Sequence, residues 1–512
     1  MAASAAPFVA PSHAAELAPG TANTVLAQQW RAVSRIGYGP SALLLAELHA
    51  AHNPQEWALA QVDRAHAASQ TLPALAPDVQ AINAPLPELF AQWKREREAR
   101  AAANAANTAN AMAPASTPAM AEPAAAPKPV AAPAAFDFST DAGPLEFKRL
   151  QVQKAIAWHL RACSQPAEEN PLLARMTEFW FNHFNVSSGK GEVGVFVGHY
   201  LINVARKHAL GRFEDLLLAS ARHPAMLYYL DQHQSVGPGS ADAKGGQRGL
   251  NENYARELME LHTLGLDGGY TQDDVRALAM ILTGWTVGPE APDGFRFAPR
   301  THQGGAKVLL GQSFSTLAPA YGESEGLDAL RMLARQPSTA RRVCTRLAQF
   351  FVADRPAPAL VERLRQTFLA SEGDMRAVLR VLLQSGDFWD PGNQLFKTPL
   401  DFACSALAGT GAVTDMRNLQ LTNGFLSGAG QPLHGWQTPD GYTTDAATWM
   451  VPEAFTRRAD FAIRLVQQSG DTSRLPDLLA PFLSSATQAA VLRARVPVRN
   501  GLLLASPEFM RK

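Results

Sequence analysis

The densest group of side chains that could do chemistry lies between residues 250 and 285, in the segment LNENYARELMELHTLGLDGGYTQDDVRALAMILTGW. Residues four positions apart share one side of a helix, so Glu252, Arg256 and Glu260 form one row. Asn253 and Glu257 form the adjacent row, and His262 follows within the same turn.

These side chains suit acid and base catalysis if they face a cleft. Glu257, Glu260 and His262 could then move protons, and Arg256 could stabilise a developing negative charge. The same pattern is also typical of a solvated helix face with local ion pairs. Both interpretations stay open, with Glu252 and Asn253 as candidate binding residues.

A metal site could draw on this helix and on two other segments. His183 lies in MTEFWFNHFNV and Asp231 ends HPAMLYYLD. If these two residues converge with Glu257 and His262, two imidazoles and two carboxylates would suit a divalent transition metal such as zinc, manganese or iron. The chain has no HExxH or paired ExxH motif, so the spacing alone does not predict that convergence.

Tryptophans and arginines supply further binding candidates. Trp285 closes the segment described above, and Trp436 lies in the Pro/Gly-rich stretch GQPLHGWQTPDGYTTDAATWM. Such a stretch either packs on the body as a strap or offers aromatic faces to a ligand such as a sugar. A basic run surrounds Pro337: Arg331, Arg335, Arg341, Arg342 and Arg346. These arginines could meet a carboxylate, a sulfate or an acidic partner, or could pair with local acids.

The elements that position these residues are helices. Apolar residues recur at helical spacing on one side of the segment's first helix: Ala255, Leu258, Leu261 and Leu264. Gly265 is placed to end that helix in the left-handed conformation. Thr271 and Asp274 form a variant capping box that begins a second helix.

Similar periodicity continues along most of the chain and predicts an all-α fold with at most one small β-hairpin, from residues 294–299 and 306–314. We expect a disordered N-terminus over 1–21, a small helical subdomain over 22–95 and the main helical body over 142–512. Between them, 96–141 is rich in Ala and Pro and poor in large apolar side chains, which predicts a disordered linker.

Composition narrows the function classes. The 512 residues include 46 Lys and Arg against 46 Asp and Glu, and this lack of basic excess argues against nucleic-acid binding. No uncharged apolar run is long enough to predict a membrane span, and no export signal is visible, so a cytoplasmic location is the default expectation. The three cysteines are far apart, and we expect neither a disulfide framework nor a cysteine-rich zinc site.

The 250–285 segment resembles the signature of the bacterial domain-of-unknown-function 1800 family. Six further stretches resemble the same family: SRIGYGP from residue 34, MTEFWFNHFNV from 176, LLLASARHPAMLYYLD from 216, PSTARRVCTRLAQFFVADRPAP from 337, FKTPLDFACSAL from 396 and GQPLHGWQTPDGY from 430. The resemblance implies a large helical bacterial protein of unestablished activity. It also implies a frequent neighbouring gene for a sulfatase-like protein with an export signal, and relatives that are often exported.

Two functional hypotheses follow. The first is a binding or accessory protein that acts with the sulfatase-like partner. The alternative is a metal-assisted hydrolase or oxidoreductase that uses the Glu/His cluster of the 250–264 helix.

Overall fold

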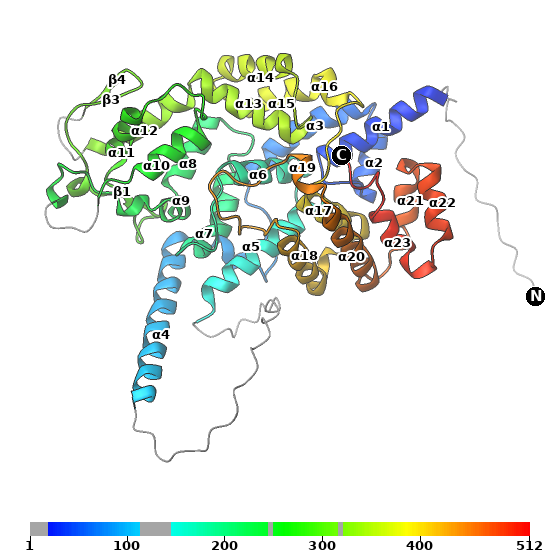
Figure 1. The fold of residues 1–512 in the computed structure, drawn as a ribbon, viewed down its shortest axis with the longest axis horizontal. Helices are drawn as coiled ribbons and strands as arrows, with labels where there is room; N and C mark the ends of the chain where they lie inside the picture. Colours follow the sequence, from blue (N-terminus) through cyan, green and yellow to red (C-terminus); the bar gives the residue numbers. More distant parts are fainter. Residues whose placement is uncertain (1–18, 113–144, 244–248, 316–320) are drawn as a thin grey trace, which may run out of the picture.

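The computed structural model describes residues 19–112, 145–243, 249–315 and 321–512, and these residues are predominantly helical (Figure 1). The N-terminal helices are α1 (Pro19–Arg35), α2 (Ala42–Ala50), α3 (Pro54–Ser69) and α4 (Leu86–Met112). The following helices are α5 (Phe147–Ser164), α6 (Pro171–His183), α7 (Val193–Tyr200), α8 (Phe213–Arg222), α9 (Pro224–Tyr229), α10 (Glu252–Glu257) and α11 (Gln272–Leu282).

The C-terminal half continues the helical architecture. Its first helices are α12 (Gly322–Ala334), α13 (Pro337–Phe351), α14 (Pro358–Ala370), α15 (Met375–Gln384), α16 (Gly386–Trp389) and α17 (Pro399–Thr410). Its last helices are α18 (Met416–Gly428), α19 (Ala446–Trp449), α20 (Pro452–Gln468), α21 (Leu475–Leu479), α22 (Ser485–Arg493) and α23 (Val496–Leu504). The predicted all-α class is therefore confirmed.

Strands are short and lie in the 285–314 region. Within the described residues, β1 (Trp285–Val287) pairs with β2 (Phe295–Phe297), and β3 (Lys307–Leu309) pairs with β4 (Gln312–Phe314), both antiparallel. The sequence predicted at most one hairpin from two stretches. Each stretch instead forms its own hairpin, because β2 pairs with the segment that follows α11 and the turn at Gly311, with φ of +78°, folds the second stretch back on itself.

One hydrophobic core includes helices from both sides of the predicted linker. The helix α3 packs against α6 and α15, and α1 sends two arginines into the body. Arg31 donates to the carbonyl of Phe388 at 3.0 Å, and Arg35 donates to the carbonyl of Phe351 at 3.1 Å. The N-terminal helices therefore help to build the body that carries the candidate site.

The predicted linker is partly wrong. The helix α4 continues to Met112 and extends away from the body in Figure 1, so 96–112 is helical. Alanine and charged residues with high helix propensity fill this stretch, which explains why a segment without large apolar side chains still forms a helix. Residues 113–141, the rest of the predicted linker, and residues 1–18 of the predicted disordered N-terminus lie outside the described residues.

A disulfide corrects the expectation from cysteine spacing. Cys163 of α5 and Cys404 of α17 are bonded, with 5.6 Å between their Cα atoms, although 241 positions separate them in sequence. Cys344 is buried and free among the described residues. Sequence spacing failed here because it carries no information about which distant helices pack together.

Among the described helices, none combines the length and apolar character that crossing a membrane requires.

Candidate functional site

The predicted helix of the 250–285 segment forms as α10 and continues as a π-helical turn, Leu258–His262. Gly265 ends it with φ of +87°, and the Thr271–Asp274 capping box begins α11, both as predicted. His262 is 1% exposed, because Ala255, Leu258 and His262 follow one another on the buried face at steps of three and four residues. The imidazole is therefore a core group and does not belong to the charged face.

The charged row of this helix makes local surface contacts. Glu252 forms an ion pair with Arg276 at 3.1 Å. The side-chain amide of Gln272 donates a hydrogen bond to Glu252 at 2.7 Å and accepts one from Arg256 at 2.8 Å. Glu260 accepts a hydrogen bond from the Tyr270 hydroxyl at 3.2 Å, and Asn253 is exposed. Contacts of this kind are expected if the charged row is a solvated helix face.

Glu257 differs from its neighbours because it is half-buried and lies near other acids. Burial raises its pKa, and the charges of Glu260 and Asp440 raise it further. Asp440 comes from a distant part of the chain, so the fold brings an acidic group that the sequence pattern did not include toward Glu257.

The predicted metal set does not come together. His183 and His262 are neighbours, since the Nε2 of His183 donates to the His262 carbonyl at 3.1 Å and the ring centroids are 6.4 Å apart. Asp231 instead pairs with Lys190 at 2.5 Å and is 52% exposed. In the described part of the chain, no three His, Cys, Asp or Glu side chains are grouped to hold a metal ion.

Both buried histidines are neutral at pH 7. Burial lowers the pKa of His262 to about 3, and the positive charges of Arg342 and Arg346 lower it further. Burial also lowers the pKa of His183 well below its usual range, again with a contribution from Arg346 and Arg342. The two arginines therefore lie close to the predicted His pair.

Trp285 is a core residue. It is 1% exposed, and its ring meets the ring of Phe295 edge to face at 5.2 Å between centroids. This tryptophan packs the β1–β2 hairpin against the body and offers no face to a ligand.

The second tryptophan candidate, Trp436, lies in the segment of residues 430–445 that connects α18 to α19 in the sequence. We call this segment the strap, and it crosses the middle of the molecule (Figure 1). Asn185 donates to the carbonyls of Trp436, at 3.1 Å, and Thr438, at 2.8 Å. The side-chain amide of Asn182 donates a hydrogen bond to the Tyr442 carbonyl at 2.9 Å and accepts one from the Tyr442 backbone N–H at 2.8 Å. These bonds hold the strap on the end of α6, as the packing interpretation expects, and Trp436 itself is half-buried.

A cleft of about 420 Å³, the strap cleft, lies between the strap, the end of α6 and α13. A second cleft of about 630 Å³, the turn cleft, lies between α13 and residues 264–267. Both are lined by Arg342, Arg346 and Gln349, so together they form one groove along α13, the α13 groove.

Arg342 and Arg346 lie near acidic groups, Glu260 and Asp440 respectively, but not in contact with a carboxylate among the described residues. Arg342 donates to the carbonyl of Leu261 at 2.8 Å, and Arg346 makes a long contact, 3.4 Å, with the carbonyl of Asp440. Among the described residues, neither guanidinium forms an ion pair with a carboxylate. Burial lowers the pKa of both, that of Arg346 to about 10, which still leaves it charged at pH 7.

Other arginines of the basic run have acidic partners. Arg331 pairs with Asp328 at 3.0 Å and with Glu214 at 3.5 Å. Arg335 pairs with Glu214 at 2.9 Å. Arg331 and Arg335 are thus paired on the surface. The other three arginines of the run, Arg341, Arg342 and Arg346, line the groove, and none of them forms an ion pair among the described residues.

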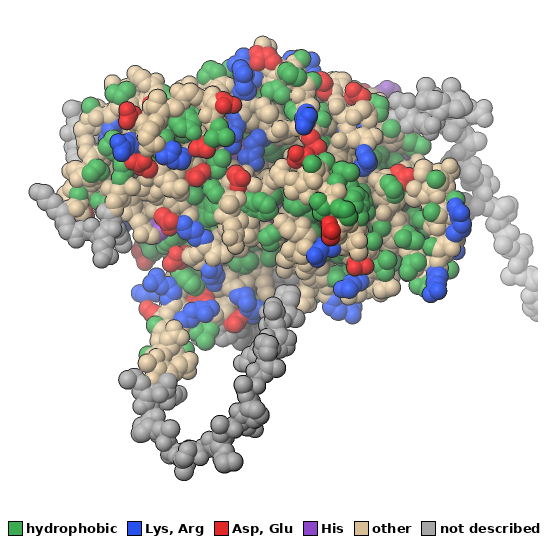
Figure 2. Space-filling view, viewed as in Figure 1, with side chains coloured by type: hydrophobic (Ala, Val, Ile, Leu, Met, Phe, Trp, Pro, Cys, Tyr) green, Lys and Arg blue, Asp and Glu red, His purple; other side chains and the backbone are tan. Residues whose placement is uncertain are grey.

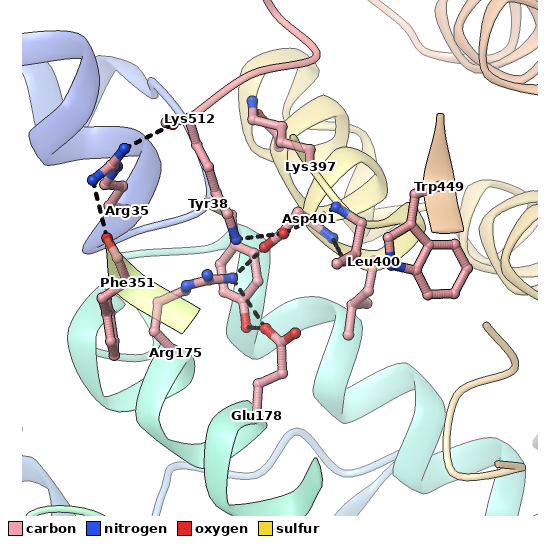
Figure 3. A network of polar contacts seen from close by, with 12 residues as sticks. Arg35, Tyr38, Arg175, Glu178, Phe351, Lys397, Leu400, Asp401, Trp449 and Lys512 are labelled. Carbon is pink, nitrogen blue, oxygen red and sulfur yellow. Dashed lines mark hydrogen bonds and ion pairs between the residues drawn. The ribbon is translucent and has the colours of Figure 1, made fainter. Parts of the chain in front are cut away.

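A buried polar network, centred on Arg175 (Figure 3), shares Tyr442 with the lining of the strap cleft. Arg175 bonds to Glu178, at 3.1 Å, and to Asp401, and Lys512 also pairs with Asp401, at 2.5 Å. The hydroxyls of Tyr38 and Tyr442 donate to Glu178. We call these six residues the Arg175 network.

In the Arg175 network, neighbouring charges outweigh burial for Arg175 and Asp401, whereas burial outweighs them for Glu178, whose pKa is raised, and for Lys512, whose pKa is lowered. Burial disfavours the charge of Arg175, but Asp401 and Glu178 outweigh it and raise the pKa of the guanidinium. Burial likewise works against the Asp401 carboxylate, but Arg175 and Lys512 lower the pKa of Asp401. The network is therefore centred on the buried ion pair of Arg175 and Asp401.

Four of the motifs that carried the family resemblance meet in this network. Tyr38, Glu178, Asp401 and Tyr442 come from the stretches that begin at residues 34, 176, 396 and 430. The model of the family described as Protein of unknown function (DUF1800) matches residues 31–511. The chain belongs to the DUF1800 family. The comparison with curated proteins finds no match, and neither does the comparison with solved structures.

In this DUF1800 protein, sequence reasoning missed three groove residues. Gln349, Asp440 and Tyr442 all line the strap cleft but were not among the candidate site residues. For Gln349 a signal existed, because it follows Arg342 and Arg346 at steps of four and three residues on α13. For the strap residues, no spacing rule connects them to α13.

Proposed function

We propose that this DUF1800 protein is a binding protein whose α13 groove takes up an anionic group, a carboxylate, sulfate or phosphate, of a ligand or partner. The observation that carries the proposal is the pair Arg342 and Arg346, one helical turn apart in a cleft and without a carboxylate partner in the described residues.

The chemistry of guanidinium supports this function. Each group is planar, carries five N–H donors and matches the oxygen spacing of carboxylate, sulfate and phosphate. Glu260 and Asp440 offset part of the cost of burying these cations, but neither carboxylate forms an ion pair with them among the described residues, so the N–H donors are available to an incoming anion. A hydrogen bond to a charged group contributes about 1.5–3 kcal/mol, so a few such bonds suffice for measurable affinity.

Sulfate titration by isothermal calorimetry tests the proposal. We expect sodium sulfate to bind the wild-type chain, and Arg346→Gln to weaken this binding at least about tenfold. Arg335→Gln is the matched control, because it removes the same charge from an arginine that already pairs with Glu214. Equal sulfate binding by the wild type and Arg346→Gln would contradict the proposal.

The partner is a separate part of the proposal. We infer from the family resemblance that the chain acts as an accessory to a sulfatase-like protein encoded nearby, with the groove as the contact for an acidic group. Co-expression and co-purification of the two proteins test this point. If the chain elutes alone in the presence of that protein, the proposed partner is wrong, but the proposed anion binding is unaffected.

A further inference from the structure

Trp436 places a flat aromatic surface in the same cleft as the two arginines. Its indole N–H donates to the hydroxyl of Thr438 at 2.9 Å, and its backbone carbonyl accepts from Asn185 at 3.1 Å. These bonds fix the ring of a half-buried tryptophan at the edge of a cleft. An aromatic face presents partial negative charge, which suits the C–H face of a sugar ring.

The strap cleft also contains groups that suit hydroxyls. The carboxylate of Asp440 lines it and forms no ion pair within the described residues. The Gln349 side chain lines it too, and its amide makes a long contact, 3.5 Å, with the Asp354 carbonyl. Because a carboxylate repels a bare anion but accepts hydrogen bonds from hydroxyls, this lining favours a ligand that carries both an acid group and hydroxyls.

The groove extends beyond the strap cleft. Past Arg342 and Arg346 the groove opens into the turn cleft. The lining of the turn cleft also contains both a basic and an acidic side chain, Arg341 and Asp267. Each cleft lies within the range of about 300–1,000 Å³ that is typical of ligand sites. A ligand of several linked polar units fits such a groove better than a single small ion does.

The geometry points to an acidic oligosaccharide as the ligand of the α13 groove. Its carboxylate or sulfate ester binds Arg342 and Arg346, one sugar ring packs on Trp436, and ring hydroxyls donate to Asp440. This inference rests on the proposed anion binding and names the ligand class. A nucleic-acid strand fits less well, because the groove lining is mixed in charge and Lys and Arg side chains lie among acidic ones over the face in Figure 2.

The test compares three kinds of probe on the full chain by calorimetry. The probes are a panel of uronate-containing and sulfated oligosaccharides, their neutral counterparts, and sodium sulfate. We expect at least one acidic oligosaccharide to bind at least about 100-fold more tightly than its neutral counterpart. Thermal melts first establish that each variant is folded.

Variants at Trp436 and Asp440 distinguish binding of the sugar rings from binding of the anionic group. We expect Trp436→Ala to weaken oligosaccharide binding at least about tenfold and Trp436→Phe to retain most of it, with sulfate binding unchanged in both. Asp440→Asn should weaken oligosaccharide binding but strengthen sulfate binding, because it removes the repulsion and keeps an amide. This opposite response is specific to a ligand with both acid and hydroxyl groups.

The failures are distinguishable. If sulfate binding depends on Arg346 but no acidic oligosaccharide binds, or Trp436→Ala leaves its binding unchanged, the carbohydrate is wrong and anion binding stands. An acidic peptide and an oligonucleotide serve as two additional comparison probes, and tighter binding of either one would also show that the ligand is not a carbohydrate. If neither sulfate nor any oligosaccharide responds to Arg346→Gln, the proposed function itself is wrong.

Discussion

The Arg175 network and the α13 groove lie back to back, and both are built around arginines. The ring of Phe350 stacks on the Arg175 guanidinium at 4.4 Å and also lines the strap cleft, and Tyr442 belongs to both regions. The regions differ in the partners of their arginines. Arg175 has two carboxylates and is inaccessible, whereas Arg346 has none among the described residues and borders a cleft. An arginine with its acids in place stabilises the fold, and one without them is available to a ligand.

The network also has a consequence for the groove. Because Tyr442 bonds to Glu178 on one side and lines the strap cleft on the other, the buried charges fix the strap that forms one wall of the site. The structural region thus positions the binding region.

The largest expected effect comes from breaking the Arg175 network. Asp401→Ala leaves Arg175 and Lys512 buried without this carboxylate, and removing one partner of a buried ion pair typically costs about 3–5 kcal/mol. Urea denaturation should show this loss in the free energy of unfolding. Arg346→Gln, by contrast, should change it by less than about 1 kcal/mol. A similar loss of unfolding free energy in both variants would contradict the assignment of a structural role to the Arg175 network and a binding role to the α13 groove.

Reduction of the disulfide should have the next largest effect. Cys163–Cys404 closes a long loop between α5 and α17, and such cross-links contribute about 2–5 kcal/mol. We expect reductant to lower the melting temperature, and alkylation of the denatured, unreduced chain to modify one of its three cysteines. Because disulfides persist in oxidising compartments, we expect this protein to function in one, contrary to the default from its sequence. Three reactive thiols in protein isolated from its native host would contradict both expectations.

Acid sensitivity should come from the histidines behind the groove. The pKa of His262 falls from 6.5 in the unfolded chain to about 3 in the folded one. Between these values the unfolded chain binds a proton that the folded chain does not. The free energy of unfolding therefore falls as the pH falls, by up to about 1.4 kcal/mol per pH unit for each such histidine.

Denaturation at several pH values between about 7 and about 4 measures this slope. His262→Gln should reduce it, whereas His52→Gln, at an exposed position, should not. An unchanged slope in His262→Gln would mean that the pKa of this imidazole does not differ between the folded and the unfolded chain.

The smallest effect is expected on the charged row of α10. Glu252→Gln and Arg256→Gln alter partly exposed contacts with Gln272 and Arg276, which contribute at most about 1 kcal/mol. Thermal melts and sulfate calorimetry should both resemble the wild type. Loss of sulfate binding in either variant would move the site from α13 to α10.

The sequence predicts local structure well and long-range partners poorly. The capping box at Thr271 and the left-handed Gly265 follow from neighbouring residues, so the helix–turn–helix of 250–285 was predictable. The burial of His262 was also readable, from its spacing to Ala255 and Leu258. By contrast, the Cys163–Cys404 bond depends on how distant helices pack, which no local pattern encodes.

The candidate site shows the same limit. Spacing places Arg342 and Arg346 on one face of α13, and the basic run was already a candidate for anion binding. Whether an acid from elsewhere neutralises them depends on tertiary contacts. Glu214 reaches Arg335 from another helix, but within the described residues no carboxylate pairs with Arg346.

Diffraction from crystals grown with sodium selenate tests the central claim most directly, because the anomalous signal of selenium locates the anion without interpretation of other density. We predict a selenate between the guanidinium groups of Arg342 and Arg346, with oxygens at hydrogen-bond distance of about 2.7–2.9 Å, and none at Arg175. Selenate bound at exposed arginines such as Arg335, with the α13 groove empty, would contradict the account.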